Sequence, residues 1–202
     1  MQQMSATPKA NGERNYWQMG YSAAHIAQKR EDILTESIRL FRERGFSGVS
    51  VSEVMKAAGL THGPFYNHFA SKDDLKAQSL AHELRRAIDA LDKIPASDRG
   101  KDSYVRYYLS VTHRDDIGTG CAIAALASEV HREEAVRGPF TELLKTKLQK
   151  LASHFPWKSK RSARSHAIHM VSAMVGGLIL ARAVNDDQFS NEILSEVRKH
   201  ID

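Results

Sequence analysis

The stretch "AAGLTHGPFYNHFASKDDL", residues 57–75, decides the fold class because it places a Gly-Pro pair directly before a cluster of aromatic side chains. Gly59 suits the left-handed end of one helix, and Thr61 can cap the next. Pro64 falls in the first turn of that next helix, where its missing N–H would have no intrahelical partner anyway. Two helices joined by so short a turn are typical of a helix-turn-helix, whose second helix enters the DNA major groove.

The short helix predicted after Thr61 has two different faces. Phe65 and Phe69 are four residues apart and share one face. We expect them to anchor the helix on its neighbours, because a helix of about two turns is not stable alone. The opposite surface carries polar groups and Tyr66, and Gly63 leaves the leading end without a side chain. A partner can therefore approach the backbone there closely.

Lys72 is interpreted as a phosphate ligand. It lies at the start of the following helix, where a cation opposes the helix dipole. A phosphate suits a helix N-terminus and would remove that conflict. The alternative is a solvated surface lysine. Tyr66 and His68 lie nearby and can also reach phosphate oxygens, which favours the phosphate interpretation.

The segment before this stretch predicts two more helices. Residues 22–44 have a helical pattern, and their apolar side chains form one stripe: Ile26, Ile33, Leu34, Ile38 and Phe41. Gly45 can end this helix in the left-handed conformation. Ser50, with Glu53 three residues later, predicts a capping box and a short second helix.

The segment after it is helical to the end of the chain. Ser71 and Asp74 predict another capping box and a long helix, which Pro95 ends. Further helices are expected at about 102–114, 120–137, 139–155, 160–185 and 187–200. No segment shows strand alternation, so the expected fold is all-α. The expected division is a flexible N-terminal arm (1–21), a helix-turn-helix DNA-binding domain (22–70) and a larger helical domain (71–202).

Residues 33–75 closely resemble the DNA-binding domain of the TetR family of bacterial transcriptional regulators, most specifically in "LFRERGF", "AAGLTHGPFYNHF" and "SKDDL". The resemblance implies three DNA-binding helices followed by a variable ligand-binding and dimerisation body. It implies base or phosphate contacts from Thr61, His62, Gly63, Pro64, Tyr66, Asn67 and His68, and phosphate contacts from Ser50 and Lys72. Pro64 stands where the family often has a small polar residue, so a possible base contact is absent there.

Composition sets wide bounds on the partners and the compartment. Of 202 residues 42% are hydrophobic and 26% charged, and the net charge of +5 permits a nucleic-acid partner without selecting one. The longest apolar run, residues 170–184, is too short for a membrane span and carries Arg182. The N-terminus has no signal-peptide pattern. The single Cys121 suits a reducing compartment. We therefore expect a cytoplasmic protein without a membrane partner. Residues 1–18 are read as a frayed arm, although Tyr16 and Trp17 could dock or reach DNA.

The C-terminal region offers candidates for an effector pocket. Polar and aromatic side chains that could line a mostly apolar cavity are Tyr104, Tyr108, His113, Cys121, Phe140, His169, Met170 and Met174. Cys121 could also be a reactive thiol at a helix start, but a small buried residue is the preferred interpretation. His166 and His169 have a spacing that some metal sites use. No further ligand lies near them in sequence, so neither a metal nor a cofactor is expected.

The dimer interface is predicted in the last long apolar segment. Ala173, Gly177 and Ala181 recur every four residues and share one helix face, which indicates close approach of another helix. Gly176, Leu180 and Val184 complete the predicted interface, which the family resemblance favours. Tight packing within one chain is the alternative.

These observations favour a ligand-responsive transcriptional regulator, a repressor, that binds a palindromic operator on double-stranded DNA as a homodimer and is released by an unknown small-molecule effector. Two other classes stay open. One is a small enzyme using Cys121 and a histidine such as His131, although no orienting group is evident. The other is a helical adaptor that binds only protein. Salt-sensitive binding to duplex DNA would separate the first from both others.

Overall fold

The computed structural model describes residues 23–201, which form helices and connecting loops without a strand. The all-α prediction is confirmed. The predicted arm, with Tyr16 and Trp17, lies outside the described residues. In chain order the helices are α1 (Ala23–Arg44), α2 (Val51–Ala57), the 3₁₀ helix η1 (Gly63–Asn67), α3 (Lys72–Asp92), α4 (Asp98–Tyr108), α5 (Val111–Asp115), α6 (Ala122–Val130), α7 (Glu134–His154), the 3₁₀ helix η2 (Lys160–Ser162), α8 (Ala163–Ala183) and α9 (Asp187–Lys199).

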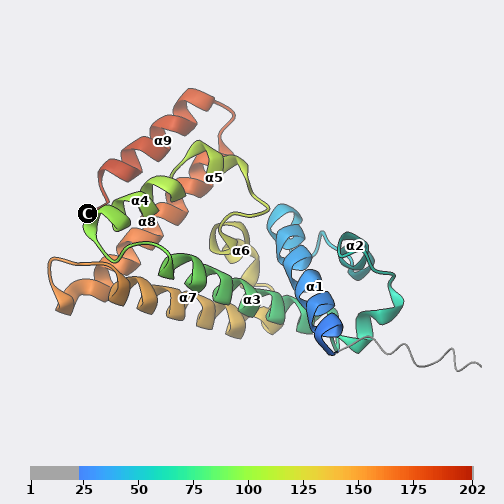
Figure 1. The fold of residues 1–202 in the computed structure, drawn as a ribbon. Helices are drawn as coiled ribbons and strands as arrows, with labels where there is room; N and C mark the ends of the chain where they lie inside the picture. Colours follow the sequence, from blue (N-terminus) through green and yellow to red (C-terminus); the bar gives the residue numbers. More distant parts are fainter. Residues whose placement is uncertain (1–22, 202) are drawn as a thin grey trace, which may run out of the picture.

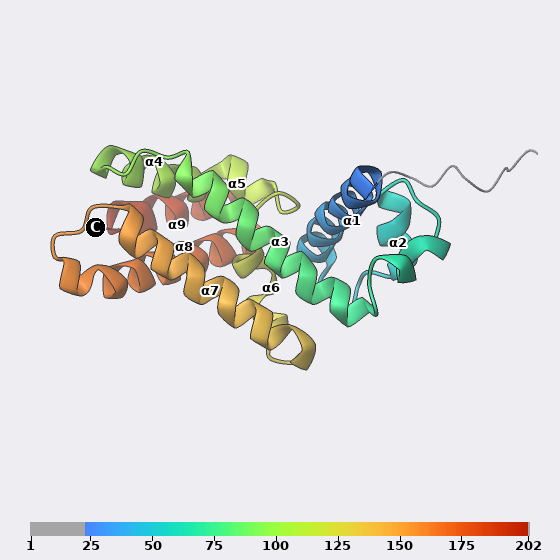
Figure 2. The same cartoon turned by 60° about the horizontal axis from the view of Figure 1, so that its bottom comes forward.

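We call residues 23–70 the head and residues 71–201 the body. Figure 1 shows α1 and α2 at one end of the molecule and α4, α5, α8 and α9 at the other. The long helix α3 leaves the head directly after η1 and runs alongside α7 into the body (Figure 2). Because α3 also packs against α1, one continuous helix contacts both parts of the protein.

The turns of the head have the predicted geometry. Gly45 and Gly59 have φ angles of 74° and 69°, a region that favours glycine. Ser50 and Glu53 form the complete capping box at the start of α2. Phe65 and Phe69 are 1% and 2% exposed, so their predicted role as anchors is confirmed. The predicted stripe of α1 is buried from Ile33 onward. Ile26 is 49% exposed, because the first turns of α1 extend beyond the core.

Two local predictions about capping were wrong. The helix after Thr61 is the 3₁₀ helix η1, its N-cap is His62, and no side chain caps it. Thr61 therefore does not act as a cap, and the buried Phe65 holds this short segment instead. Before α3, Ser71 accepts a hydrogen bond from the N–H of Asp74 at 3.0 Å. The Asp74 carboxylate accepts from the Ala70 N–H at 2.9 Å, so the second capping box is only half formed.

The helix boundaries of the body also differ from the prediction. The segment 102–114 contains two helices, because Ser110 caps a new helix, α5. The break expected near residue 138 lies earlier, between Val130 and Glu134, and α7 runs through Pro139. Val136, Phe140 and Leu143 of α7 are buried on one face around this proline. Their packing outweighs the hydrogen bond that a proline removes inside a helix.

Helix α8 is long and apolar enough by length and composition to cross a membrane, which differs from the expectation that no such run exists. A core helix of a soluble protein passes the same test. The contacts of α8 are those of a core helix, because it packs against α5, α6, α7 and α9.

The small residues of the predicted dimer face of α8 pack within the chain. A Cβ atom at Gly177 would lie 3.0 Å from Cγ2 of Val197 on α9, and Ala181 is 2% exposed. The close helix approach that the small residues indicated is therefore made within one chain, between α8 and α9. Ala173 and Val184 are partly buried, whereas Gly176 has open space beside it and Leu180 is 58% exposed. A different side of α8 is open, and we call it the outer face: the exposed Ile168, Ile179 and Leu180 with the partly buried Gly176.

Candidate DNA-binding surface and ligand cavity

The residues that the sequence assigned to DNA contact lie at the start of α2, in and around η1 and at the start of α3, and we call this set the DNA-facing surface. Its exposed members are Ser50, Thr61, His62, Gly63, Tyr66 and Asn67. Pro64, His68 and Lys72 are partly buried. The ring of Tyr66 is prominent, with 70% of the residue's surface exposed. The surface therefore offers hydroxyl, amide, imidazole and ammonium groups, which are the groups that contact phosphates and base edges.

Aromatic packing holds this surface from beneath. The ring of Phe65 stacks against that of Phe69 with centroids 5.7 Å apart. Tyr66 meets Phe65 edge-on at 5.1 Å, and His62 lies 6.4 Å from each of these two rings. The guanidinium of Arg30 on α1 lies 5.3 Å from the centre of the Phe69 ring. Rings anchored in this way position the polar ends of Tyr66 and His62 without using their hydrogen-bonding groups.

Lys72 is the first residue of α3 and makes no ion pair with a carboxylate of residues 23–201. The two aspartates beside it are engaged elsewhere. Asp73 pairs with Lys76 at 3.0 Å, and Asp74 accepts from the backbone of Ala70. The ammonium of Lys72 thus stays available at the N-terminus of α3, as a phosphate contact requires.

Ser50 and His68 have local constraints. The Ser50 hydroxyl donates to Oε2 of Glu53 at 2.7 Å, so a phosphate would have to compete with the capping box. The backbone N–H and the hydroxyl of Ser50, with Arg44, lower the pKa of Glu53 to about 2. The pKa of His68 is lowered by burial and then by the charge of Arg30, which favours a neutral imidazole.

The body contains a cavity of about 180 Å³. It lies between α3, α4, α5, α7 and the loop before α6, and its lining residues are Glu83, Leu84, Ala87, Ile88, Ala90, Leu91, Ile94, Tyr104, Tyr107, Tyr108, His113, Thr119, Gly120, Cys121, Lys147 and Lys150. Four of the eight predicted ligand residues are brought together here: Tyr104, Tyr108, His113 and Cys121. The other four lie outside it. Phe140, Met170 and Met174 are buried in the helix packing, and His169 is exposed on α8.

Of two buried polar groups in the cavity, His113 has a hydrogen-bond partner and the hydroxyl of Tyr108 has none among residues 23–201. Nδ1 of His113 lies 2.7 Å from the carbonyl oxygen of Tyr108, and burial lowers the pKa of this histidine. The hydroxyl of Tyr108 is buried and has no hydrogen-bond partner among residues 23–201. Burial, and then the neighbouring Cys121, raise the pKa of Tyr108 well above its ordinary value. A buried hydroxyl without a partner is costly in an otherwise well-paired protein.

The charges around the cavity are also unevenly paired. Glu83 pairs with Arg42 at 3.0 Å, and Lys150 pairs with Asp92 at 2.6 Å. Lys147 has no ion-pair partner among the carboxylates of the described residues. Burial disfavours its charged form, but Tyr104, Cys121 and Glu83 outweigh burial and raise its pKa. Lys147 is therefore a cation at neutral pH.

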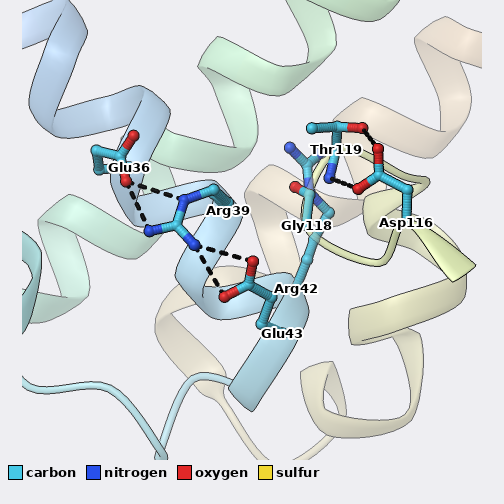
Figure 3. Close-up of polar contacts among 7 residues, drawn as sticks. All are labelled: Glu36, Arg39, Arg42, Glu43, Asp116, Gly118 and Thr119. Carbon is cyan, nitrogen blue, oxygen red and sulfur yellow. Dashed lines mark hydrogen bonds and ion pairs between the residues drawn. The ribbon is translucent and has the colours of Figure 1, made fainter. Parts of the chain in front are cut away.

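Arg42 joins the head to the wall of this cavity. Its Nε donates to the carbonyl oxygen of Gly118 at 2.8 Å and its Nη1 to that of Gly120 at 3.0 Å. Figure 3 shows the side chain reaching from α1 to the loop 116–121, where Asp116 accepts hydrogen bonds from Thr119. The Arg42 side chain is 3% exposed. We call Arg42, Glu83 and the loop 116–121 the junction.

Gly118 of the junction lies against α1. A Cβ there would lie 2.4 Å from Oε1 of Glu43, so a larger residue would displace the Glu43 side chain. One further contact ties the head to the body: Glu129 of α6 accepts from the backbone N–H of Phe46 at 2.9 Å.

Sequence reasoning missed the junction and Lys147. The signal for Arg42 was present, because Leu34, Ile38 and Arg42 continue one row at intervals of four on α1. A cation on an apolar row indicates a buried partner. The partners themselves, Gly118 and Gly120, are carbonyl groups more than seventy residues away, so no sequence pattern could identify them.

The chain offers little support for a cysteine-histidine enzyme. Cys121 and His131 are the N-cap and C-cap of α6, so the whole helix separates them. Within residues 23–201 no group of three or more His, Cys, Asp or Glu side chains is arranged to hold a metal ion.

The fold and the two candidate sites define a helix-turn-helix protein with an effector-sized cavity. Residues 33–78 match the family model described as bacterial regulatory proteins, tetR family. The chain is 30% identical over 106 residues to the HTH-type transcriptional repressor NemR of Escherichia coli strain K12, covering 50% of this chain and 53% of that repressor. It is 27% identical over 128 residues to the HTH-type transcriptional repressor DhaR of Mycobacterium sp. strain GP1, covering 60% of this chain and 59% of that repressor.

Solved structures show the same fold over most of the chain. A TetR family transcriptional regulator from Agrobacterium tumefaciens superposes with a TM-score of 0.69 at 21% identity, covering 87% of this chain and 98% of that one. The reduced form of E. coli NemR gives a TM-score of 0.68 at 20% identity, covering 86% and 95%. The chain therefore resembles the TetR family of transcriptional regulators, by sequence in residues 33–78 and by fold over most of its length. The matched stretches span little more than half the length of the two curated repressors, 53% and 59%.

Proposed function

We propose that the protein is a cytoplasmic, ligand-responsive transcriptional repressor. It binds a palindromic operator as a homodimer and is released when a small molecule occupies the cavity. The observation that carries the proposal is the junction: Arg42 of the DNA-binding head bonds directly to the loop that forms one wall of the cavity. A ligand that displaces this loop must alter the contacts of α1.

Helix α3 and the junction both connect the DNA-facing surface with the cavity. Helix α3 begins at the DNA-facing surface with Lys72 and lines the cavity with Glu83 and Leu84. Glu83 also pairs with Arg42, so the Arg42 guanidinium of α1 contacts both α3 and the loop 116–121. An effector regulates only if it binds the DNA-competent and DNA-incompetent arrangements with different affinity. The junction is where that difference would be transmitted.

The dimer is proposed to form through the outer face of α8, with Phe189 of α9 beside it. Ile168 and Ile179 are each 42% exposed, Leu180 is 58% exposed and Phe189 is 49% exposed. Several exposed apolar side chains on two adjacent helices indicate an interaction surface. A dimer would also set two DNA-facing surfaces about one DNA turn apart, as reading a palindrome requires.

The proposal is tested by selecting bound duplexes from a random DNA pool and searching the gene's upstream region for the selected site. We expect a palindromic site whose affinity falls steeply with salt. Leu180→Glu should give monomers, by sedimentation velocity, that no longer form the specific complex. Thr141→Glu, which adds the same charge to an exposed position on α7, is the control. Failure to bind any duplex would favour the adaptor, and a dimeric Leu180→Glu protein would place the interface elsewhere.

A further inference from the structure

The cavity has the size of a single-ring molecule. Its volume of about 180 Å³ is close to that of an engineered cavity of roughly 150 Å³ that binds benzene. Drug-sized ligands occupy pockets of about 300 Å³ or more. Leu84, Ile88 and Leu91 of α3 supply an apolar wall. The ligand that fits is therefore small and largely apolar.

The side chains that α4 and α5 contribute to the cavity are aromatic. The rings of Tyr108 and His113 lie 4.7 Å apart, those of Tyr107 and His113 5.6 Å apart, and those of Tyr104 and Tyr108 6.5 Å apart. Rings prefer offset or edge-on contacts with other rings at these distances. A planar aromatic ligand can extend this cluster, which an aliphatic chain of the same volume cannot do.

Two groups of the cavity, the Tyr108 hydroxyl and the Lys147 ammonium, complement an anionic oxygen. The hydroxyl of Tyr108 is buried and makes no hydrogen bond within the described residues. Lys147 lines the cavity beside Tyr104 and makes no ion pair with a carboxylate of residues 23–201, while Glu83 pairs with Arg42 and Lys150 with Asp92. The formal charge left over is a single positive one.

From this combination we infer that the cavity binds a small single-ring aromatic carboxylate, whose carboxylate pairs with Lys147 and accepts a hydrogen bond from Tyr108. The inference rests on the proposed function for its biological meaning, since it names the chemical class of the effector. It stands on its own as a statement about binding. A neutral or cationic ring of the same shape would fill the apolar space but leave the charge of Lys147 unpaired.

The test uses three nearly isosteric probes on the full-length protein without DNA: benzoate, benzamide and benzamidine, which are negative, neutral and positive. Calorimetry should rank benzoate first and benzamidine last. Lys147→Met should weaken benzoate roughly tenfold or more, the size expected for a charge-assisted hydrogen bond, and leave benzamide nearly unchanged. Lys150→Met is the matched control, because Lys150 is already paired, and should change benzoate affinity by about twofold or less.

A second variant separates the loss of a ligand contact from misfolding. Tyr108→Phe removes only a hydroxyl that has no hydrogen-bond partner among residues 23–201, so the thermal stability should not fall. It should weaken benzoate and benzamide alike by roughly three- to tenfold, because both probes carry an oxygen that accepts a hydrogen bond. The inference is overturned if benzoate does not bind at millimolar concentration, if benzamide or benzamidine binds as tightly, or if Lys147→Met weakens all three probes equally.

A separate measurement distinguishes this inference from the proposed function. Benzoate is added to the complex with the selected operator in a shift assay. Release that disappears in Lys147→Met supports both statements. Binding that depends on Lys147 but leaves the DNA complex intact supports the ligand class and contradicts an effector role for the cavity.

Discussion

The DNA-facing surface and the junction use polar groups in opposite ways. Tyr66 and Asn67 make no side-chain hydrogen bond within the described part of the chain, so their polar ends face solvent. At the junction, Arg42 is buried and its guanidinium bonds to two carbonyl oxygens and one carboxylate. The first region keeps its groups open for a partner. The second has closed them within the chain, so substitutions there should affect folding before they affect binding.

The largest effect is expected at Arg42. Arg42→Ala leaves the Glu83 carboxylate and two loop carbonyls without partners, and breaking a buried pair in this way costs about 3–5 kcal/mol of unfolding free energy. Arg39→Ala is the control one turn earlier on α1. Its ion pairs with Glu36 and Glu43 are surface contacts, visible beside Arg42 in Figure 3, and removing them should cost about 1 kcal/mol or less. Urea denaturation measures both, and equal losses would contradict the contrast.

Gly176 and Gly177 are neighbours on α8 that differ in the same way, because Gly177 faces α9 and Gly176 faces open space. Gly177→Ala places a Cβ 3.0 Å from Val197, and overpacking of this kind costs about 1–3 kcal/mol. Gly176→Ala meets open space, so the better helix propensity of alanine should stabilise the fold by up to about 1 kcal/mol. Thermal unfolding should therefore move in opposite directions. A stabilising Gly177→Ala would show that α8 and α9 pack less tightly than described.

The DNA-facing surface should respond in binding and not in stability. Lys72→Ala should weaken all duplexes about equally, by the loss of one phosphate contact, and lower the slope of log affinity against log salt by about 0.9. Tyr66→Phe should likewise weaken binding without regard to sequence, whereas His62→Ala or Asn67→Ala should alter sequence preference. Salt titrations on the selected site and on a scrambled site measure this. An unchanged slope for Lys72→Ala would remove its phosphate role.

The smallest effect concerns Glu53, which is exposed and belongs to the capping box of α2. Its pKa in the folded protein is lowered to about 2 from an ordinary 4.5, first by the backbone N–H of Ser50. The stabilisation is therefore complete above about pH 4.5 and is lost as the pH falls through 2. Glu53→Gln should show a flatter decline of melting temperature between pH 5 and pH 2.5 than the wild type. Parallel declines would mean that other carboxylates dominate in this range.

Most of the head could be predicted from the sequence because its structure depends on local chemistry. Left-handed glycines at 45 and 59, the Ser50–Glu53 box and the anchors Phe65 and Phe69 all act within a few residues of one another. The exposed positions that we assign to DNA contact follow from the same short stretch. Two predictions failed here because neighbouring groups took over the roles. His62 and not Thr61 is the N-cap of η1, and the Asp74 carboxylate accepts from the N–H of Ala70 and not from that of Ser71.

The cavity and the two faces of α8 depended on the tertiary structure. Four of eight predicted ligand residues meet in the cavity, because α3, α4, α5, α7 and a loop all contribute to it and their mutual orientation is set by packing. Small residues at intervals of four on α8 indicated close approach of a helix, but the sequence could not say whose helix. The structure assigns it to α9 of the same chain through Gly177 and Val197. Periodicity determines that a face is buried, and only the packing of distant elements determines what covers it.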